Sequence, residues 1–87
     1  MKYGGVYMHL NAAIAKRIVE LCKERKMTQY RLELNSGVTH GAMDRILSGT
    51  NKTVTLTTVY KIAKGFKMSF HEFIDDEIFK STELELD

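Results

Sequence analysis

"MTQYRLELNSGVTHGAMDRILSG", residues 27–49, contains the signals for two short helices and a turn between them. Thr28 is a good N-cap for a helix over "QYRLELNS", and Gly37 supplies the left-handed conformation that commonly follows a helix C-terminus. Thr39 then caps a second helix that ends at Gly49. The inward face of this second helix is formed by Met43, Ile46 and Leu47. The stretch therefore predicts two helices joined by about three residues, a unit whose second helix can project from the body.

A further helix is predicted on the N-terminal side of this unit. Asn11 is a suitable N-cap, and the helix is expected to run to about Lys26. Apolar residues follow at the spacing of one helical stripe. These residues are Ile14, Ile18, Leu21 and Cys22.

Two more helices are predicted on the C-terminal side. Thr55 would cap the first, although Val54 and Leu56 alternate with Thr and a short strand is the alternative there. The inward residues of this helix are expected to be Leu56, Val59, Tyr60, Ile62, Ala63 and Phe66. "SFHE", residues 69–72, is a capping box that opens the last helix. Its apolar residues are Phe70, Phe73, Ile74 and Ile78.

The length of 87 residues and the hydrophobic content of 44% fit one small all-α domain of five helices. We expect an N-terminal arm over residues 1–9, the helical domain over 10–79 and an acidic tail over 80–87. The single Cys excludes an internal disulfide and fits a reducing cytoplasm. The first residues faintly resemble a secretion signal, but His9 and Asn11 interrupt its apolar part. No apolar run approaches the length of about 18 residues that a membrane helix needs.

The charge is unevenly distributed along the chain. Residues 1–70 hold 12 Lys and Arg against four acidic residues, a net charge of +8. Residues 71–87 hold one Lys against seven acidic residues, a net charge of −6. A basic body favours a polyanionic partner, and an acidic end would stay away from it. Ordinary solvated surface is the alternative reading of the same charges.

Residues 27–49 resemble the helix-turn-helix of the Cro-like phage-repressor family, also described as lambda repressor-like or XRE-type. The resemblance continues through "TLTTVYKIAKGFKMSFHEFI", residues 55–74. The matching residues are Gln29, Leu32, Gly37, Val38, Met43, Ile46, Ala63 and Ser69. The resemblance implies a five-helix DNA-binding domain. In it, the helix capped by Thr28 is helix 2, and the helix capped by Thr39 is helix 3, which enters the major groove.

Two residues depart from the family pattern. Glu33 stands where a small residue commonly separates helices 2 and 3, and Ser36 stands where Leu is common. Either the two helices sit slightly further apart, or the Glu33 side chain turns outward and pairs with a basic residue such as Arg45. Both arrangements leave the fold intact and affect the angle of helix 3.

The resemblance places five residues opposite DNA bases: His40, Gly41, Ala42, Asp44 and Arg45. Arg45 is the main specificity candidate, because a guanidinium can bind guanine O6 and N7 together, worth roughly 1–3 kcal/mol. Asp44 could accept from cytosine or orient Arg45. Gly41 would permit close approach, and the methyl of Ala42 could meet a thymine methyl. His40 could bond a base or a phosphate, more strongly when charged below about pH 6.5.

Other residues are candidates for phosphate contact, which fixes register without reading sequence. The resemblance points to the start of helix 2 and the loop after helix 3, and a solvated loop is the alternative. The candidates are Thr28, Gln29, Arg31, Thr39, Asn51, Lys52 and Thr53.

The sequence offers little support for other chemistry. His9, Cys22, His40 and His71 lack the spacing of metal ligands, and Cys22 lies on the apolar stripe of the first helix, so we expect no metal site. A Gly-rich phosphate loop and a nucleophile with a base partner are also missing, so neither an enzyme nor a cofactor is expected.

The last helix carries more apolar residues than one buried side needs, which favours self-association. A dimer surface is predicted at Phe73, Ile78 and Phe79. A two-fold dimer would place two recognition helices about 34 Å apart on DNA. The expected function is therefore a cytoplasmic, dimeric, sequence-specific DNA-binding regulator, by resemblance a repressor, of bacterial or phage origin and associated with the nucleoid. The alternative is an antitoxin or protein-interaction module of the same fold, which holds a toxin or another regulator and in which DNA contact is secondary or absent.

Overall fold

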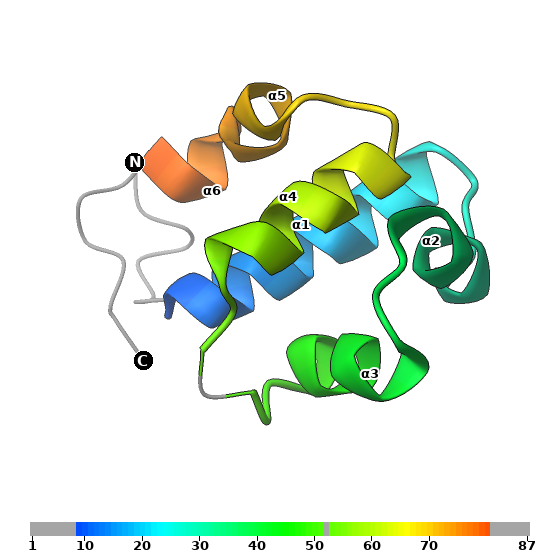
Figure 1. The fold of residues 1–87 in the computed structure, drawn as a ribbon. Helices are drawn as coiled ribbons and strands as arrows, with labels where there is room; N and C mark the ends of the chain where they lie inside the picture. The colour runs from blue at the N-terminus through cyan, green and yellow to red at the C-terminus, as the bar shows by residue number, and fades with distance from the viewer. Residues whose placement is uncertain (1–8, 52, 81–87) are drawn as a thin grey trace.

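The structure is a computed structural model that describes residues 9–51 and 53–80. Within these ranges it contains six helices and no strand (Figure 1). The helices are α1 Leu10–Glu24, α2 Gln29–Ser36, α3 His40–Ser48, α4 Leu56–Gly65, α5 Phe70–Ile74 and α6 Glu77–Lys80. The all-α class is confirmed, and the alternative strand near Val54 does not form. Most of the predicted arm and tail lies outside the described residues.

Local capping signals place most of the helix boundaries. The hydroxyls of Thr28, Thr39 and Thr55 each accept a hydrogen bond from the backbone N–H three residues later, at 3.0, 3.2 and 3.1 Å. Gly37 and Gly49 follow α2 and α3 with φ values of 78° and 79°, the left-handed conformation that glycine adopts without a steric penalty. These five predictions are confirmed.

The start of α1 differs from the prediction. The helix begins at Leu10 with His9 as its N-cap residue, so the prediction of Asn11 as the cap was wrong. Asn11 lies inside the first turn, where its side-chain amide donates a hydrogen bond of 3.3 Å to the carbonyl of Asn51. Because Asn51 belongs to the loop after α3, this tertiary contact ties α1 to the loop.

The predicted fifth helix is divided in two. The capping box between Ser69 and Glu72 opens α5 as expected. The helix then stops before Asp75, and α6 begins only at Glu77. The carboxylate of Asp76 accepts a hydrogen bond of 3.0 Å from the backbone N–H of Ile78, which satisfies an amide in the first turn of α6. The side chain of Asp76 therefore favours a new helix start at this point, because Asp side chains compete for backbone amides.

One continuous apolar core contains residues from each of the helices α1 through α5. Ile78 of α6 is also fully buried. The largest fully buried side chains are Phe66, Phe73, Ile18, Leu21, Leu32, Met43, Ile62 and Ile78. Two predicted inward residues of α4 are instead on the surface, since Leu56 is 74% exposed and Tyr60 is 51% exposed. They lie at the edge of the helical stripe and not inside the core.

Small residues allow α2 and α4 to pack closely. A Cβ atom added to Gly65 would lie 2.9 Å from Cβ of Ser36 and 3.0 Å from Cδ1 of Leu32. Ser36 is therefore accommodated as a small residue facing α4. Its hydroxyl also accepts a hydrogen bond of 3.2 Å from the N–H of Val38 in the turn.

Arg17 anchors α1 to the C-terminal helices. Its Nε donates to the carbonyl of Phe73 at 2.7 Å, and its Nη2 donates to the carbonyl of Glu72 at 2.9 Å. Its Nη1 forms an ion pair of 3.1 Å with Asp76. The side chain thus caps the end of α5, a role that sequence analysis did not identify.

Candidate nucleic-acid interface

The turn between α2 and α3 is held by the core, while the front of α3 is left open. Val38 in the turn is 7% exposed, and Met43 and Ile46 bury the back of α3. Figure 1 shows α3 at the lower edge of the molecule, away from α5 and α6. Of the predicted base-facing residues, His40, Gly41, Asp44 and Arg45 are exposed. Ala42 is half-buried and packs against the core.

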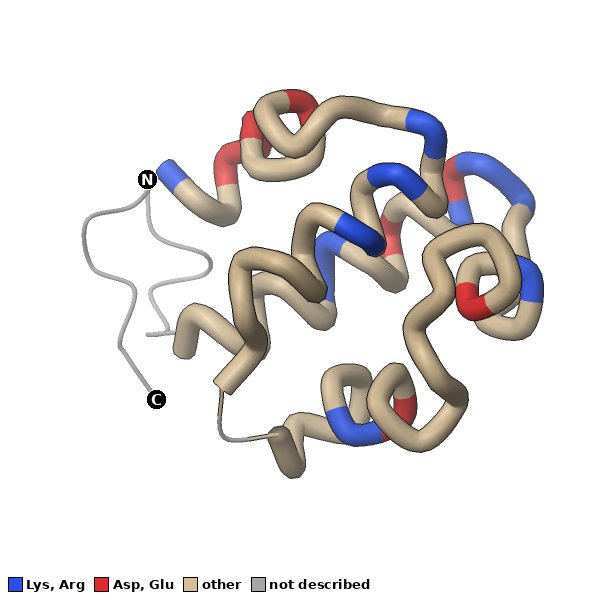
Figure 2. Tube along the Cα trace, in the orientation of Figure 1, with Lys and Arg blue, Asp and Glu red and all other residues tan. Residues whose placement is uncertain are grey.

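Arg45 is the one Lys or Arg of α3. A Cβ atom added to Gly41 would lie 3.5 Å from Nη1 of Arg45, so the guanidinium lies back over the first turn of the helix. Figure 2 shows positive charge on α3 beside a negative residue. The acidic residues of α5 and α6 lie at the far side of the molecule from α3 in the same view. The acidic residues of α5 and α6 therefore lie away from α3, although Asp76 pairs with Arg17 of α1.

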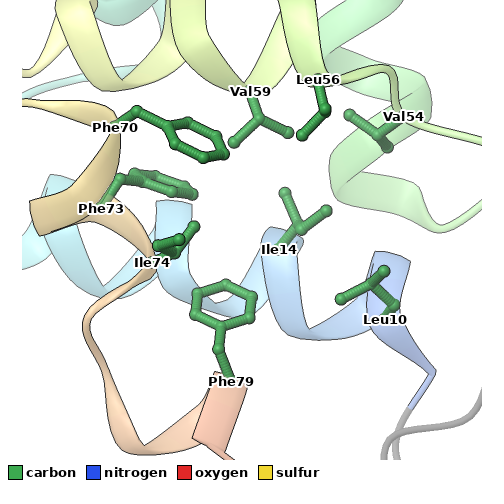
Figure 3. Close-up of a pocket in the computed structure, with 9 residues that line it drawn as sticks. All are labelled: Leu10, Ile14, Val54, Leu56, Val59, Phe70, Phe73, Ile74 and Phe79. Carbon is green, nitrogen blue, oxygen red and sulfur yellow. The ribbon is translucent and has the colours of Figure 1, made fainter.

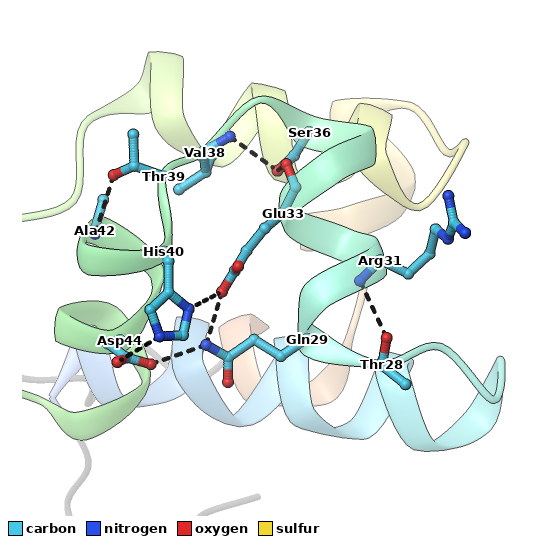
Figure 4. Close-up of polar contacts among 10 residues, drawn as sticks. All are labelled: Thr28, Gln29, Arg31, Glu33, Ser36, Val38, Thr39, His40, Ala42 and Asp44. Carbon is cyan, nitrogen blue, oxygen red and sulfur yellow. Dashed lines mark hydrogen bonds and ion pairs between the residues drawn. The ribbon is translucent and has the colours of Figure 1, made fainter.

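Four polar side chains connect α2 to the start of α3 (Figure 4). The amide Nε2 of Gln29 donates to Oε2 of Glu33 at 2.8 Å and to Oδ1 of Asp44 at 2.9 Å. The ring of His40 lies between the same two carboxylates. Its Nδ1 is 2.9 Å from Oε2 of Glu33, and its Nε2 is 3.2 Å from Oδ2 of Asp44. We call Gln29, Glu33, His40 and Asp44 the carboxylate network.

The sequence left open that Glu33 turns outward and pairs with Arg45. It does not, because Glu33 is only 8% exposed and its carboxylate accepts from Gln29 and His40. A carboxylate removed from water is costly unless it is paired and hydrogen-bonded. Its two partners lie at the start of α2 and the start of α3, so Glu33 fastens the two helices together at the front of the unit.

The carboxylate network changes the protonation of His40. The hydrogen bond to Glu33 is the main cause that raises the pKa of His40, followed by the charges of Asp44 and Glu33. The ordinary value is about 6.5. The paired ring therefore stabilises the fold fully below about pH 6.5, and this contribution is lost as pH rises through the raised pKa. His40 carries its charge to higher pH than the sequence alone indicated.

A model of the Cro/C1-type helix-turn-helix DNA-binding domain matches residues 17–77. The chain belongs to this family. The match spans α2, α3, α4 and α5, so the family's DNA-binding unit coincides with the unit described above. No curated protein matches the chain. The Cro/C1-type domain is a DNA-binding domain, and such domains serve in the regulation of transcription.

The predicted phosphate-contact residues of this Cro/C1-type domain fall into two groups. Thr28 and Thr39 cap α2 and α3, and Arg31 has an exposed side chain on α2. The amide of Gln29 uses both of its N–H hydrogens on carboxylates, so in this arrangement it has no donor left for a phosphate.

The second group lies in the loop after α3. Asn51 is half-buried, and its side-chain amide donates a hydrogen bond of 2.9 Å to the carbonyl of Thr53. Thr53 itself is exposed. Its backbone N–H donates 3.2 Å to the carbonyl of Arg45. The loop is therefore fixed to the end of α3 on one side and to α1 through Asn11 on the other. Lys52 lies outside the described residues.

An apolar hollow of about 250 Å³ lies between α4, α5 and the start of α1 (Figure 3). Leu56 and Ile74 stand exposed at this hollow, and Phe79 is half-buried. The prediction of Phe73 and Ile78 as a dimer surface was wrong, since both are 0% exposed and belong to the interior. Their buried apolar side chains hold the short helices α5 and α6 against the rest of the domain. Phe79 packs on Phe73 with ring centroids 6.3 Å apart.

The described residues offer no other obvious chemistry. Among residues 9–51 and 53–80, no group of three His, Cys, Asp or Glu residues could hold a metal ion. Cys22 is half-buried against the core, and burial raises the pKa of its thiol, which disfavours the reactive thiolate. In the part of the chain that the structure describes, no helix is long and apolar enough to cross a membrane.

Proposed function

We propose that this chain is a sequence-specific regulator of transcription, acting as a repressor, that inserts α3 into the major groove of duplex DNA. The observation that supports this most directly is the exposed front of α3, which carries Arg45 on a helix whose back is anchored by Met43 and Ile46. A rigid helix with a mixed polar front is suited to reading several different base pairs. The proposed place of action is the nucleoid of a bacterium or of a phage-infected host.

Salt dependence tests the DNA-binding part of this proposal. We expect the logarithm of the association constant for a random-sequence duplex to fall linearly with the logarithm of salt concentration. The slope should be about −0.9 for each phosphate neutralised. Fluorescence anisotropy over a series of KCl concentrations measures it. A module that uses this fold only for contacts with other proteins should show no measurable affinity for the duplex at low salt.

Arg45→Ala is expected to remove sequence preference at one base pair, at a cost of roughly 1–3 kcal/mol on the preferred duplex. The same change should alter binding to random duplex much less. Competition between preferred and point-substituted duplexes measures this difference.

Arg31→Ala is the matched control, because Arg31 is exposed on α2 and is proposed to touch phosphate. It should weaken all duplexes alike and reduce the salt slope by about 1. Equal losses on all duplexes for Arg45→Ala would remove its proposed base-reading role.

We further propose that two copies pair through the apolar face formed by Leu56, Tyr60 and Ile74. These residues are 74%, 51% and 38% exposed and surround apolar hollows between α4 and α5. Contiguous exposed apolar surface commonly marks an interaction site. A second copy seated there leaves the front of α3 free, and a two-fold pair would read two half-sites about one helical turn apart.

Tyr60→Ser is expected to shift the chain toward the monomer in sedimentation velocity at several concentrations, because it removes apolar surface from the proposed contact. Tyr30→Ser is the matched control, since Tyr30 is also an exposed tyrosine, at 67%, but lies on α2. It should leave the dimer unchanged. A wild-type chain that stays monomeric at all concentrations would instead favour the second candidate function, in which this apolar face binds a toxin or another regulatory protein.

A further inference from the structure

We propose that Glu33 is a positioning residue of the DNA-reading surface, and that the carboxylate network makes DNA binding depend on a proton held by His40. This inference rests on the proposed function, because it concerns how the same surface meets phosphates. It assigns a role to the residue that departs most clearly from the family pattern.

The hydrogen bonds of the His40 ring show how many protons it must hold. A carboxylate can only accept hydrogen bonds, whereas neutral imidazole has one donor nitrogen and one acceptor nitrogen. Both ring nitrogens of His40 lie against carboxylate oxygens, at 2.9 Å for Glu33 and 3.2 Å for Asp44. Only the imidazolium can donate to both. The observed arrangement is therefore that of the charged ring.

Two charged side chains act on the ring of His40. Glu33 comes from α2 and Asp44 from α3, and these are the groups whose charges act on the pKa of His40. Among the described residues of α1, which also packs on α3, none contributes to it. With the proton in place, the network carries one net negative charge. Without the proton it carries two.

The net charge of the carboxylate network would change how DNA binds to the front of α3. Asp44 and His40 are exposed on the front of α3, with side chains 58% and 72% accessible. Loss of the proton removes one of the ring's two bonds and raises the net negative charge of the network from one to two on the side where phosphates would approach. DNA should therefore bind more tightly to the protonated form. By linkage, bound DNA should also make the proton harder to remove.

The role of Glu33 follows from its burial. Because its carboxylate is only 9% accessible and accepts from both Gln29 and His40, it fixes the direction of two side chains on the DNA side. Asp44 is exposed and can move, so Glu33 is the fixed point of the network. Replacing it should release His40 and lower the pH at which the ring loses its proton.

The first test follows the His40 ring by NMR between pH 5 and 9 in the free protein. We expect Glu33→Gln to lower the titration midpoint of His40, and Asp44→Asn to lower it by less. If Glu33→Gln fails to fold, Asp44→Asn still tests whether the carboxylate network holds the proton on His40, because Asp44 is on the surface. An unchanged midpoint in the folded variants would overturn the positioning role of Glu33.

The second test measures the affinity for a random-sequence duplex at pH 6.0 and pH 8.5 at constant ionic strength. For the wild type we expect affinity to fall about threefold to tenfold as pH rises, since a pKa difference of one unit between free and bound protein is tenfold. His40→Gln should abolish this fall. His71→Gln is the matched control, an exposed histidine on α5, and should retain it.

The outcomes separate the two proposals. DNA binding that does not change with pH, or that keeps its pH dependence in His40→Gln, overturns the inference and leaves the proposed function intact. No binding to any duplex at pH 6.0 overturns the proposed function and the DNA-dependent half of the inference together. The NMR midpoints then decide the remaining half, because they need no DNA.

Discussion

Phe73→Ala should lower the free energy of unfolding by about 3–5 kcal/mol, a large part of the stability of a small domain. Phe73 is 0% exposed and belongs to the core. Its ring also lies 5.7 Å from the guanidinium of Arg17, and Phe79 packs against it. Truncation would leave a cavity beneath α5 and weaken the contact that joins α1 to the C-terminal helices. Urea denaturation followed by far-UV circular dichroism measures the change.

Leu34→Ala is the matched control for this prediction. Leu34 is also a large apolar residue, but it lies on α2, outside the proposed dimer face, and is 54% exposed, so its truncation should cost less than about 1 kcal/mol. A dimer contact at Phe73 would instead make the loss depend on protein concentration. A similar small loss for both variants would contradict the placement of Phe73 in the core.

Gly65→Leu is expected to destabilise the fold by about 3 kcal/mol, the upper part of the usual range for overpacking. Leucine is a better helix former than glycine by several tenths of a kcal/mol, so the loss cannot come from helix propensity. It comes from the contact with α2, where even a Cβ atom would lie 2.9 Å from Cβ of Ser36. Both of these Cβ atoms are fixed by their backbones, so α2 and α4 would have to separate. Thermal and urea denaturation measure the loss.

The same small substitution at two helical glycines provides the control. Gly65→Ala should destabilise, whereas Gly41→Ala should stabilise by roughly 0.5–1 kcal/mol. A Cβ atom at Gly41 would meet only Nη1 of Arg45, at an ordinary contact distance of 3.5 Å. If Gly65→Ala also stabilised the protein, the close packing of α2 on α4 would be refuted. Gly41→Ala also tests whether DNA approaches α3 closely, because affinity would then fall while stability rises.

Local signals explain why most of the fold could be predicted from the sequence. The caps at Thr28, Thr39 and Thr55 act within three residues, and Gly37 and Gly49 act at single positions. These are short-range effects that do not depend on the rest of the chain. The inward residues Met43 and Ile46 follow from helical periodicity in the same way.

Tertiary contacts explain the predictions that were wrong. Asn11 has the side chain of an N-cap, but it donates to Asn51, 40 residues away in the sequence. Phe73 and Ile78 look like surplus apolar surface when α5 and α6 are read as one helix. In the structure, which breaks the helix at Asp75 and Asp76, both side chains lie in the core. Periodicity alone could not separate Tyr60, at the edge of its stripe, from the buried residues beside it.

The candidate site was only partly accessible to sequence reasoning. The exposed residues His40, Gly41, Asp44 and Arg45 could be proposed because the family resemblance fixed the front of the recognition helix. The partners of Glu33 could not, since residues from two helices compete for each acidic side chain and only geometry decides among them. In the structure the acidic groups bind Gln29 and His40, and Arg45 is left exposed at the front of α3.

Selection of bound duplexes from a random library by the purified protein, at low and moderate salt, tests the central claim most directly. The account predicts enrichment of a near-palindromic motif whose half-site centres lie about 10 base pairs apart. The enriched bases should change in Arg45→Ala and should not change in Arg31→Ala. Failure to enrich any motif, with only weak binding that salt removes equally from all sequences, would contradict the proposal that α3 reads DNA sequence.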